Sequence, residues 1–468
     1  MNEIVTDTIL ANVSPPPNTR LAIRARLTRR EWAATPLTSR LSVIARARHA
    51  IARDARVLAA TLARPEADSL SAEILPLAEA AAFLVRRAPR ILGTSRLNPA
   101  GPLWLFGVRQ EIRREPRGAV LILGPGNYPL FLPGAQALQA LAAGNAVAIK
   151  PAPGKSEPMH ALAALLAQAG LPEGLLTVLP EDAGPDAVRA GYDFIVLTGS
   201  APTGVAVARV AAETLTPATM ELSGVDAVFV LPGADLPLVA ASLAYGLRLN
   251  AGSTCIAPRR VFVPRALEAD LLSLLLARLP PPAAIPAATA ARLADLVADA
   301  ERQGARVAAR NPTVLAGATP EMQLLQQDVF APWLALTPVA DAEAALEAAD
   351  LCPYALGASI FGPQPEATAL AARIRAGSVC INDLIVPTAD PRLPFGGRGQ
   401  SGYGLTRGAE GLLEMTVAKT VSTRRGRFRP HLDARFSTDA PKLLALIQLL
   451  HGTWADRLNA LKALRLRR

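Results

Sequence analysis

The longest uncharged stretch of the chain, residues 118–149, limits the possible folds more than any other feature of the sequence. It is long enough to cross a bilayer as a helix, which needs about 20 apolar residues. Gly-Pro-Gly-Asn-Tyr-Pro at 124–129 and Pro133-Gly134 interrupt it, however, and a membrane helix would not keep these helix breakers. The stretch is therefore interpreted as a strand, a loop, a helix and a second strand.

Short apolar segments continue this pattern along the chain, after a helical region over residues 20–90. The first series of expected strands is Ala119–Leu123, Ala146–Ile149, Leu176–Leu179, Phe194–Leu197 and Ala227–Val230. The second series is Arg260–Val263, Leu334–Val339, Ser359–Phe361 and Val379–Asn382. Helical patterns such as Ser156–Ala169 and Thr203–Thr214 separate them. Strands that alternate with helices predict an α/β protein with two doubly wound domains, divided near 223–226.

The charge and the cysteine content exclude several classes of protein. Residues 424–468 carry +8 of the formal net charge of +10, so the body is nearly neutral. With 4% aromatic residues, this body does not favour nucleic-acid binding. Three cysteines cannot build a disulfide framework, and the N-terminus lacks a basic segment followed by an apolar run. We expect a cytoplasmic protein without a bound metal.

Two glycine-rich segments are candidates for phosphate binding. Gly397-Arg-Gly-Gln-Ser-Gly402 has dinucleotide-loop spacing, but no expected strand precedes it and no helix opens after it, so it is interpreted as a turn. Thr198–Gly204 instead follows an expected strand and opens an expected helix. Its Gly199, Ser200 and Gly204 allow close backbone approach at a helix N-terminus, which favours an anion. A purely conformational role of these residues is the alternative.

One cysteine stands out from the other two. Cys255 lies in Asn250-Ala-Gly-Ser-Thr-Cys-Ile-Ala, a small and polar approach that suits an accessible thiolate nucleophile. An isolated cysteine is otherwise most often a small buried hydrophobic residue. That second interpretation applies to Cys352 and Cys380, which lie in apolar runs.

Seven segments in one order resemble the aldehyde dehydrogenase superfamily. They are residues 115–129, residues 141–151, Thr198-Gly-Ser with Gly204, Glu221-Leu-Ser-Gly, the Cys255 segment, Asp328-Val-Phe-Ala-Pro, and Pro394-Phe-Gly-Gly followed by Ser401-Gly. The resemblance covers residues 20–425. Asn382-Asp-Leu-Ile-Val and the Asn-Tyr-Pro variant are most similar to the class 3 branch and its bacterial relatives.

The resemblance implies oxidation of an aldehyde to a carboxylate with NADP or NAD. Cys255 would attack the aldehyde carbon, and the Asn127 amide and the Cys255 N–H would hold the oxyanion. Glu221 would activate the water that hydrolyses the thioester. Asn127 as a turn residue and Glu221 as a surface carboxylate are the alternatives. The expected cofactor-binding residues are Lys150, Lys155, Gly199, Ser200, Gly204, Asp328 and Phe330.

The sequence also departs from the family pattern. Gly126 replaces the usual Trp, Pro153 replaces a Glu at the adenosine ribose, and Asp328 replaces a Glu at the nicotinamide ribose. Ser223 and Val225 replace the usual Gly and Lys. Two other functions therefore stay open: an acylating enzyme that passes the thioester to coenzyme A, and a silenced scaffold that binds cofactor or lipid.

The resemblance also implies a domain organisation. Residues 1–97 and 117–223 would form the NAD(P)-binding domain and residues 224–415 the catalytic domain. Strands near 98–116 and 416–426 would form a small oligomerisation element, which implies a homodimer.

Two predictions concern the ligands. Pro153 removes a carboxylate that would repel a 2′-phosphate, and Lys155 could pair with that phosphate, so NADP should be accepted at least as well as NAD. The residues expected along the entrance and beside the nucleophile are Tyr128, Phe131, Leu132, Ala135, Thr254 and Ile256. They predict an apolar aldehyde of medium or long chain, or a bulky one, although core packing explains the same residues.

Residues 437–468 form a basic extension with two expected helices. Asp439 would cap the first, with Pro441 at its first position, and Gly452 would end it. Thr453 would cap the second in a capping box with Asp456. Its apolar face is Trp454, Leu458, Leu461 and Leu464, and its cations are Arg457, Lys462, Arg465 and Arg468. This pattern suits peripheral membrane contact; a helical hairpin packed on the body or across a dimer is the alternative.

Overall fold

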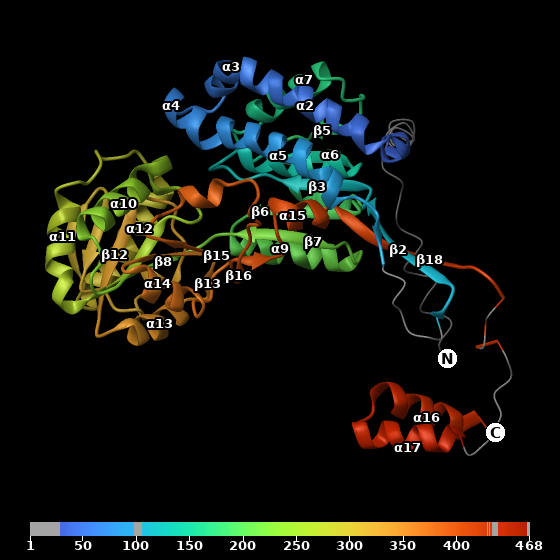
Figure 1. Cartoon of the computed structure of the whole chain (residues 1–468). Coiled ribbons are helices and arrows are strands. Elements are labelled where there is room, and N and C mark those ends of the chain that lie inside the picture. Colours follow the sequence, from blue (N-terminus) through green and yellow to red (C-terminus); the bar gives the residue numbers. More distant parts are fainter. Residues whose placement is uncertain (1–28, 98–104, 428, 430, 433–438, 466–468) are drawn as a thin grey trace, which may run out of the picture. The chain divides into compact units, whose positions relative to one another are not determined.

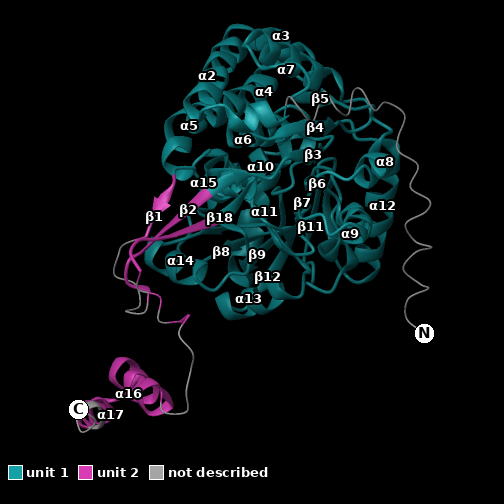
Figure 2. Cartoon of the chain, turned by 90° about the vertical axis from the view of Figure 1, so that its right-hand side faces the viewer, with its two compact units in different colours: residues 1–93, 114–419 teal, residues 94–113, 420–468 magenta. Residues whose placement is uncertain are grey.

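The computed structural model describes residues 29–97, 105–427, 429, 431–432 and 439–465. The chain forms two compact units, one of residues 1–93 and 114–419 and one of residues 94–113 and 420–468 (Figure 2). The first unit contains two parallel sheets, and both are described below (Figure 1).

The first sheet has six strands in the order β17-β7-β6-β3-β4-β5. Its strands are β3 Ala119–Leu123, β4 Ala146–Lys150, β5 Leu176–Val178, β6 Phe194–Gly199, β7 Ala218–Leu222 and β17 Gly402–Tyr403. All pairings are parallel except that of β17 with β7. The uncharged stretch therefore folds as expected, into β3, a loop, a helix and β4.

Helices cover both faces of this sheet. One face carries α2 Leu37–Arg53, α5 Leu75–Ile91, α6 Phe131–Ala143 and α7 Glu157–Gln168, and the other carries α8 Gly184–Arg189 and α9 Ala201–Glu213. Every residue of α6 is buried, because α2, α5 and α7 enclose it against the sheet. The remaining helices of this half are α3 Ala55–Ala60, α4 Glu66–Ser69, the π-helix η1 Leu70–Ile74 and α15 Gly408–Glu414.

The second sheet has seven strands in the order β10-β11-β12-β9-β8-β14-β15. They are β8 Asp226–Val230, β9 Pro258–Pro264, β10 Arg306–Arg310, β11 Thr313–Ala316, β12 Trp333–Val339, β14 Gly357–Phe361 and β15 Ser378–Ile381. Only the β10–β11 pairing is antiparallel. The flanking helices are α10 Leu236–Arg248, α11 Glu268–Leu276, α12 Ala287–Arg302, α13 Ala342–Asp350 and α14 Gln364–Ala371. Two such sheets confirm the expected α/β architecture.

The glycine-rich segment at 397–402 is a tight turn between two short strands. β16 Arg398–Gly399 pairs with β13 Tyr354–Ala355, whereas β17 pairs with β7 of the six-stranded sheet. The interpretation as a turn is confirmed. Short 3-10 segments are η3 Leu249–Gly252, η4 Arg265–Leu267, η5 Gln323–Gln326 and η6 Val386–Ala389.

The second unit contains a three-stranded sheet and two helices. The sheet order is β1-β2-β18, with β1 Ser95–Arg96, β2 Val108–Pro116 and β18 Thr416–Arg424. The helices α16 Ala440–His451 and α17 Trp454–Arg465 pack against each other. Thr453 and Asp456 form the expected capping box, whereas Pro441 takes the second helical position instead of the first. Leu464 and Arg465 lie where side chains are not described, and Arg468 lies outside the described residues.

Candidate active site

A cavity of about 250 Å³ in the first unit is lined by residues of β7, of α5 and α6, and of α10 and the loops next to the seven-stranded sheet. Cys255, Glu221 and Arg407 line it, and most of its other walls are apolar. The apolar and aromatic lining includes Ala72, Pro76, Tyr128, Phe131, Leu132, Tyr245, Leu249, Ile256, Ile385, Val386 and Phe395. Two of the three expected catalytic residues therefore share one cavity, together with Arg407, which the sequence analysis did not select.

Cys255 follows a strained turn at the end of α10. Asn250, Ala251 and Gly252 have φ values of 50°, 51° and 68°, so three consecutive residues are left-handed. A Cβ on Gly252 would lie 2.6 Å from the Ala331 carbonyl oxygen, which restricts this position to glycine. The half-buried Cys255 follows three residues later. Burial raises the pKa of its thiol well above the usual range, and the charge of Glu221 raises it further.

Glu221 is buried at the end of β7, so the surface-carboxylate alternative is wrong. Glu221 is 2% exposed, and its Oε2 accepts a hydrogen bond of 2.9 Å from the Thr406 hydroxyl. Its Oε1 has no hydrogen-bond partner among the described residues. Burial raises the pKa of this carboxyl, whereas Arg407 and the Thr406 bond lower it. A buried carboxylate with a free oxygen can accept a proton from a small molecule in the cavity.

Asn127 lies beside the nucleophile loop without lining the cavity itself. Its Nδ2 donates to the Ser253 carbonyl at 3.0 Å, and its Oδ1 accepts from the Tyr128 N–H at 3.0 Å. The second bond is a local turn contact, so the expected turn role and the contact with the Cys255 loop are both present. An amide NH2 carries two hydrogens, so Nδ2 retains one donor beyond its bond to Ser253.

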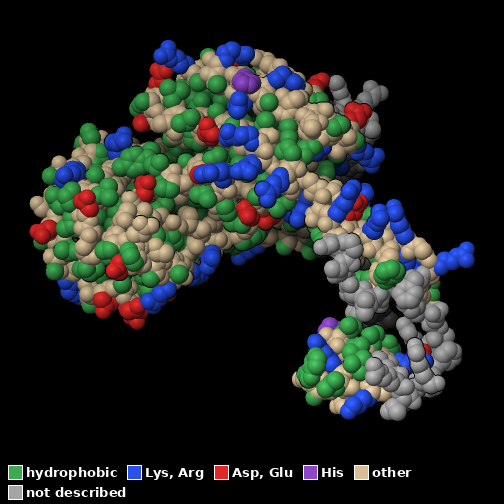
Figure 3. Space-filling model, viewed as in Figure 1, with side chains coloured by type: hydrophobic (Ala, Val, Ile, Leu, Met, Phe, Trp, Pro, Cys, Tyr) green, Lys and Arg blue, Asp and Glu red, His purple; other side chains and the backbone are tan. Residues whose placement is uncertain are grey.

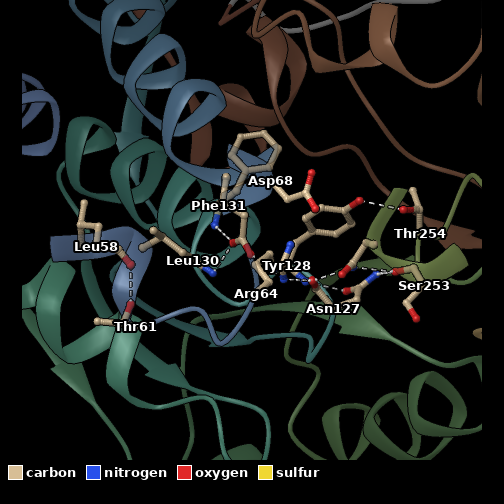
Figure 4. Close-up of polar contacts among 12 residues, drawn as sticks. Leu58, Thr61, Arg64, Asp68, Asn127, Tyr128, Leu130, Phe131, Ser253 and Thr254 are labelled. Carbon is tan, nitrogen blue, oxygen red and sulfur yellow. Dashed lines mark hydrogen bonds and ion pairs between the residues drawn. The ribbon is translucent and has the colours of Figure 1, made fainter. Parts of the chain in front are cut away.

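An ion pair between Arg64 and Glu73, in the N-terminal part of the chain, holds the loop that carries Asn127 (Figure 4). Arg64 donates from Nη2 to the Asn127 carbonyl at 2.7 Å, and the same nitrogen lies 2.9 Å from Oε1 of Glu73. Asn250 donates to the same Asn127 carbonyl at 3.0 Å. Tyr128, next in the chain, is bonded through its hydroxyl to the Thr254 hydroxyl at 2.7 Å. The loop that carries Asn127 is thus fixed from two directions.

Glu73 anchors the start of α6. Its Oε2 accepts the N–H groups of Leu130 and Phe131 at 2.7 and 2.9 Å, two donors that have no partner within the helix. Burial raises the pKa of Glu73, and Arg64 and the two N–H groups lower it. The sequence analysis missed Arg64, Glu73 and Asn250, because Glu73 and Arg64 lie in an ordinary helical pattern far from residue 127.

Two of the expected cofactor residues, Lys150 and Gly199, end the parallel strands β4 and β6, and Ser200 follows Gly199. Ser200 caps the 13-residue helix α9 and accepts from the Thr203 N–H at 3.4 Å. A Cβ on Gly204 would lie 2.7 Å from Leu222 Cδ1, so glycine allows α9 to pack closely on the sheet. The Ser223 hydroxyl donates to the Gly199 carbonyl at 3.4 Å, and its interaction with Asp328 lowers the pKa of that carboxyl. A glycine turn at a helix N-terminus fits a phosphate.

Three further residues of the expected cofactor set are Asp328, Phe330 and Lys150. Asp328 is half-buried, its Oδ1 has no hydrogen-bond partner among the described residues, and burial raises the pKa of its carboxyl. Phe330 follows it and is half-buried, as is Lys150 at the end of β4. An orphaned carboxylate oxygen fits a ribose hydroxyl, and a lysine at the sheet edge fits the other ribose. The donor and acceptor set therefore fits a dinucleotide.

The loop around Lys155 binds the carboxylate of Glu181, a contact that the sequence analysis did not expect. Glu181 accepts the N–H groups of Gly154, Lys155 and Ser156 at 2.6, 3.0 and 3.0 Å. These bonds lower the pKa of Glu181, so it stays ionised at neutral pH. Pro153 therefore removes one carboxylate from this loop while Glu181 supplies another.

Cys352 and Cys380 are buried in apolar surroundings, as expected, and all three cysteines are free. Within the described ranges, no group of three or more His, Cys, Asp or Glu residues could hold a metal ion.

Comparison with known proteins shows which proteins this chain is similar to. Residues 18–421 match the family described as the aldehyde dehydrogenase family. A 4,4′-diapolycopene aldehyde oxidase from Methylomonas sp is 33% identical over 382 residues, which cover 77% of this chain and 72% of that protein. A Mycolicibacterium smegmatis protein provisionally named succinate-semialdehyde dehydrogenase (NADP(+)) is 30% identical, covering 86% and 83%. A Mycobacterium tuberculosis aldehyde dehydrogenase complexed with NAD+ has a TM-score of 0.78 at 28% identity, covering 83% and 86%.

Proposed function

Because the chain belongs to the aldehyde dehydrogenase family, we propose that Cys255, Glu221 and Asn127 carry out NAD(P)-dependent oxidation of an aldehyde to a carboxylate. The observation that carries this proposal is the shared cavity: Cys255 and Glu221 both line it, and one oxygen of the buried Glu221 carboxylate has no hydrogen-bond partner among the described residues.

The residues support a two-stage reaction. Cys255 reacts as the thiolate, after its proton has passed to solvent. Its sulfur bonds to the aldehyde carbon as the C–O π bond breaks, and the oxygen takes that electron pair as an oxyanion. The Cys255 N–H and the remaining hydrogen of Asn127 Nδ2 are the donors for that oxyanion. The cofactor, when bound, accepts the hydride that leaves this carbon. Glu221 then takes a proton from water, the water oxygen bonds to the thioester carbon, and the sulfur leaves as the carboxylate forms.

Substitution of Cys255 by Ala tests the proposal. Loss of the nucleophile should abolish aldehyde oxidation without unfolding the protein. Cys352→Ala is the matched control, because Cys352 is buried away from the cavity, and it should retain activity. Oxidation at the wild-type rate by Cys255→Ala would refute the mechanism.

Water is the proposed acceptor of the acyl group. The free Glu221 oxygen supports hydrolysis over transfer to coenzyme A, and the retained cavity residues argue against a silenced scaffold. A product assay with and without coenzyme A distinguishes the three. The proposal expects carboxylate in both reactions; an acyl-coenzyme A product or no turnover would replace it.

The proposed substrate is an apolar aldehyde of medium or long chain, or a bulky one. Of the predicted set, Tyr128, Phe131, Leu132, Thr254 and Ile256 line the cavity, whereas Ala135 does not. The apolar members would select by burial of apolar surface. The similarity to a 4,4′-diapolycopene aldehyde oxidase also supports this class. A panel of straight-chain aldehydes should show kcat/KM rising with chain length; a steady fall would contradict the proposal.

NADP is proposed to be accepted at least as well as NAD. Lys155 and the loss of a carboxylate at Pro153 support this preference, whereas Glu181 opposes it. Lys155→Met should therefore lower kcat/KM for NADP more than for NAD, and Glu181→Gln should do the reverse. A preference of the unmodified enzyme for NAD of about a hundredfold, or about 2.8 kcal/mol, would contradict the proposal.

We further propose residues 1–97 with 117–223 as the cofactor domain, 224–415 as the catalytic domain, and 98–116 with 416–426 as the contact of a homodimer. Strand β18, at the edge of the sheet in the second unit, supports the dimer, because an open edge has backbone groups free to pair. Sedimentation analysis should give a dimer, and Val417→Pro in β18 should shift it toward monomer. A monomeric wild-type protein would contradict this part.

The tail is proposed to bring a cytoplasmic enzyme to the membrane periphery. No helix of the described residues is long and apolar enough to cross a membrane. Hydrophobic side chains are nevertheless exposed on the tail helices, including Ile447, Trp454 and Leu458 (Figure 3). Liposomes with anionic lipid should bind the full chain in a salt-sensitive way and release it when residues after His451 are deleted. Equal binding by both proteins, or none, would contradict the proposal.

A further inference from the structure

Arg407 is an unusual residue in the wall of the active-site cavity. Its backbone has φ 59° and ψ 179°, a region that only glycine adopts readily. The residue is 7% exposed, and its Nε has no hydrogen-bond partner among the described residues. Strained backbone and an orphaned buried donor are both features that concentrate at functional sites.

The guanidinium is held in place mainly by packing. Its Nη1 donates to the Thr388 carbonyl at 2.6 Å. Its Cζ lies 4.4 Å from the centroid of the Phe395 ring and 5.8 Å from that of Phe131. Both aromatic residues line the same cavity. Arg407 is therefore a fixed cation in a largely apolar cavity, with no carboxylate within ion-pair distance among the described residues.

The charges around Cys255 show what this cation does. Glu221, Asp226 and Asp328 all act on the thiol as negative charges and disfavour its ionisation. Among the charges that act on Cys255, Arg407 is the one that favours the thiolate. Arg407 also favours the ionised form of Glu221, which Thr406 supports by its hydrogen bond. Tyr128 is the other titratable group that interacts with Cys255.

We propose that Arg407 is a positioning residue whose positive charge allows the Cys255 thiolate and the Glu221 carboxylate to coexist in one buried cavity. The proposal rests on Cys255 being the nucleophile. Two negative charges in a desolvated site repel each other, and a cation that touches neither can stabilise both. Because Arg407 makes no direct ion pair with Glu221, the carboxylate oxygen stays free to accept a proton from water.

Alkylation of Cys255 by iodoacetamide tests this role without any aldehyde turnover. The thiolate sulfur displaces iodide, so the rate reports the ionised fraction of Cys255. Rates are measured from pH 6 to 10 on the full chain, and Cys255→Ala supplies the background from the two buried cysteines. Arg407→Met should move the midpoint of the rate profile to higher pH and slow alkylation at neutral pH about tenfold, the factor for one pKa unit.

Two further variants separate charge from structure. Arg407→Lys keeps the charge and should retain a profile close to wild type. Arg392→Met removes one positive charge from an exposed ion pair with Asp390 and should leave the profile unchanged. An unshifted profile in Arg407→Met, or an equal shift in Arg407→Lys, would overturn the proposal. If the wild-type protein alkylates with this profile but oxidises no aldehyde, the proposed function fails and the role of Arg407 stands.

Discussion

The Asn127 loop and the reaction cavity both bury carboxylates, but they treat them differently. Glu73 behind the loop is fully buried and binds two backbone N–H groups and Arg64. Glu221 in the cavity is nearly as buried, but its Oε1 has neither a hydrogen bond nor an ion pair among the described residues. Glu73 Oε1 also accepts no hydrogen bond, but it is ion-paired with Arg64. Asp226 and Asp328 near the cavity also keep one oxygen without a partner there. The first arrangement stabilises a shape, and the second leaves groups available for chemistry.

Glu221→Gln should have the largest effect, which is on turnover. Loss of the base should lower steady-state kcat by about 10²–10⁴, the usual contribution of general base catalysis. The first turnover should still release one equivalent of reduced cofactor per site, because Cys255 is intact. Rapid-mixing kinetics measure both phases. An unchanged steady-state rate would break the distinction between the two carboxylates.

Glu73→Ala should act mainly on stability. Removing one partner of a buried ion pair lowers the free energy of unfolding by about 3–5 kcal/mol, because Arg64 keeps a charge without its partner. Urea unfolding measures this change. The control is Glu79→Ala on α5, whose ion pair with Arg86 is exposed and spans 3.8 Å; that change should stay within about 1 kcal/mol.

The pH dependence of stability should also report on Glu221. Burial raises the pKa of Glu221 in the folded protein above its ordinary value of 4.5, so the folded state holds this proton more tightly than the unfolded chain. Wild-type stability contributed by this group is therefore lost as pH rises from 4.5 through the raised pKa. Gln does not titrate, so Glu221→Gln should gain about 1–3 kcal/mol over wild type by pH 8 and nothing below pH 4. A pH-independent difference would show that Glu221 is not the titrating group.

The smallest effect should come from Asn250→Gly. This change removes one of two donors to the Asn127 carbonyl while tolerating the positive φ at residue 250. Since Arg64 still donates to that oxygen, the free energy of unfolding should fall by only about 0.5–1.5 kcal/mol. Thermal unfolding at fixed pH measures the change. A loss as large as that of Glu73→Ala would mean that the loop has no redundant support.

Strands with continuous apolar runs could be predicted from the sequence. Ala119–Leu123 matches β3 at both ends, and the other expected strands lie within two residues of the observed ones. Two of the strands that were missed carry other patterns, whereas β11 Thr313–Ala316 is an apolar run that was also missed. β7 reads Ala-Thr-Met-Glu-Leu, with the candidate base inside it, and β10 reads Arg-Val-Ala-Ala-Arg, which resembles a helical segment. These segments form strands because they pair with neighbouring strands, and such pairing is not visible in the local sequence.

The site could be predicted only where it has a local motif. Cys255 and Glu221 lie in short segments that resemble family motifs, and the structure places both in one cavity. Glu73 and Arg64 act on a loop more than 50 residues away, so no local pattern reveals them. Arg407 is one of many arginines in the chain, and only its burial and backbone conformation distinguish it.

The glycine-rich turn has a mechanical consequence for the molecule. The Ser401 hydroxyl donates to the Ser223 carbonyl at 2.8 Å and accepts the Ala355 N–H at 3.0 Å, and its carbonyl accepts from Leu222. A Cβ on Gly402 would lie 1.9 Å from the Met220 carbonyl oxygen, so the contact with β7 is very close. The turn thus connects the end of β7 in the six-stranded sheet to Ala355 of β13, which precedes β14 of the seven-stranded sheet. A hinge motion that separated the two sheets would have to break these hydrogen bonds. We expect ligands to enter and leave by local motion of loops around the cavity, with the two sheets moving as one stiff body.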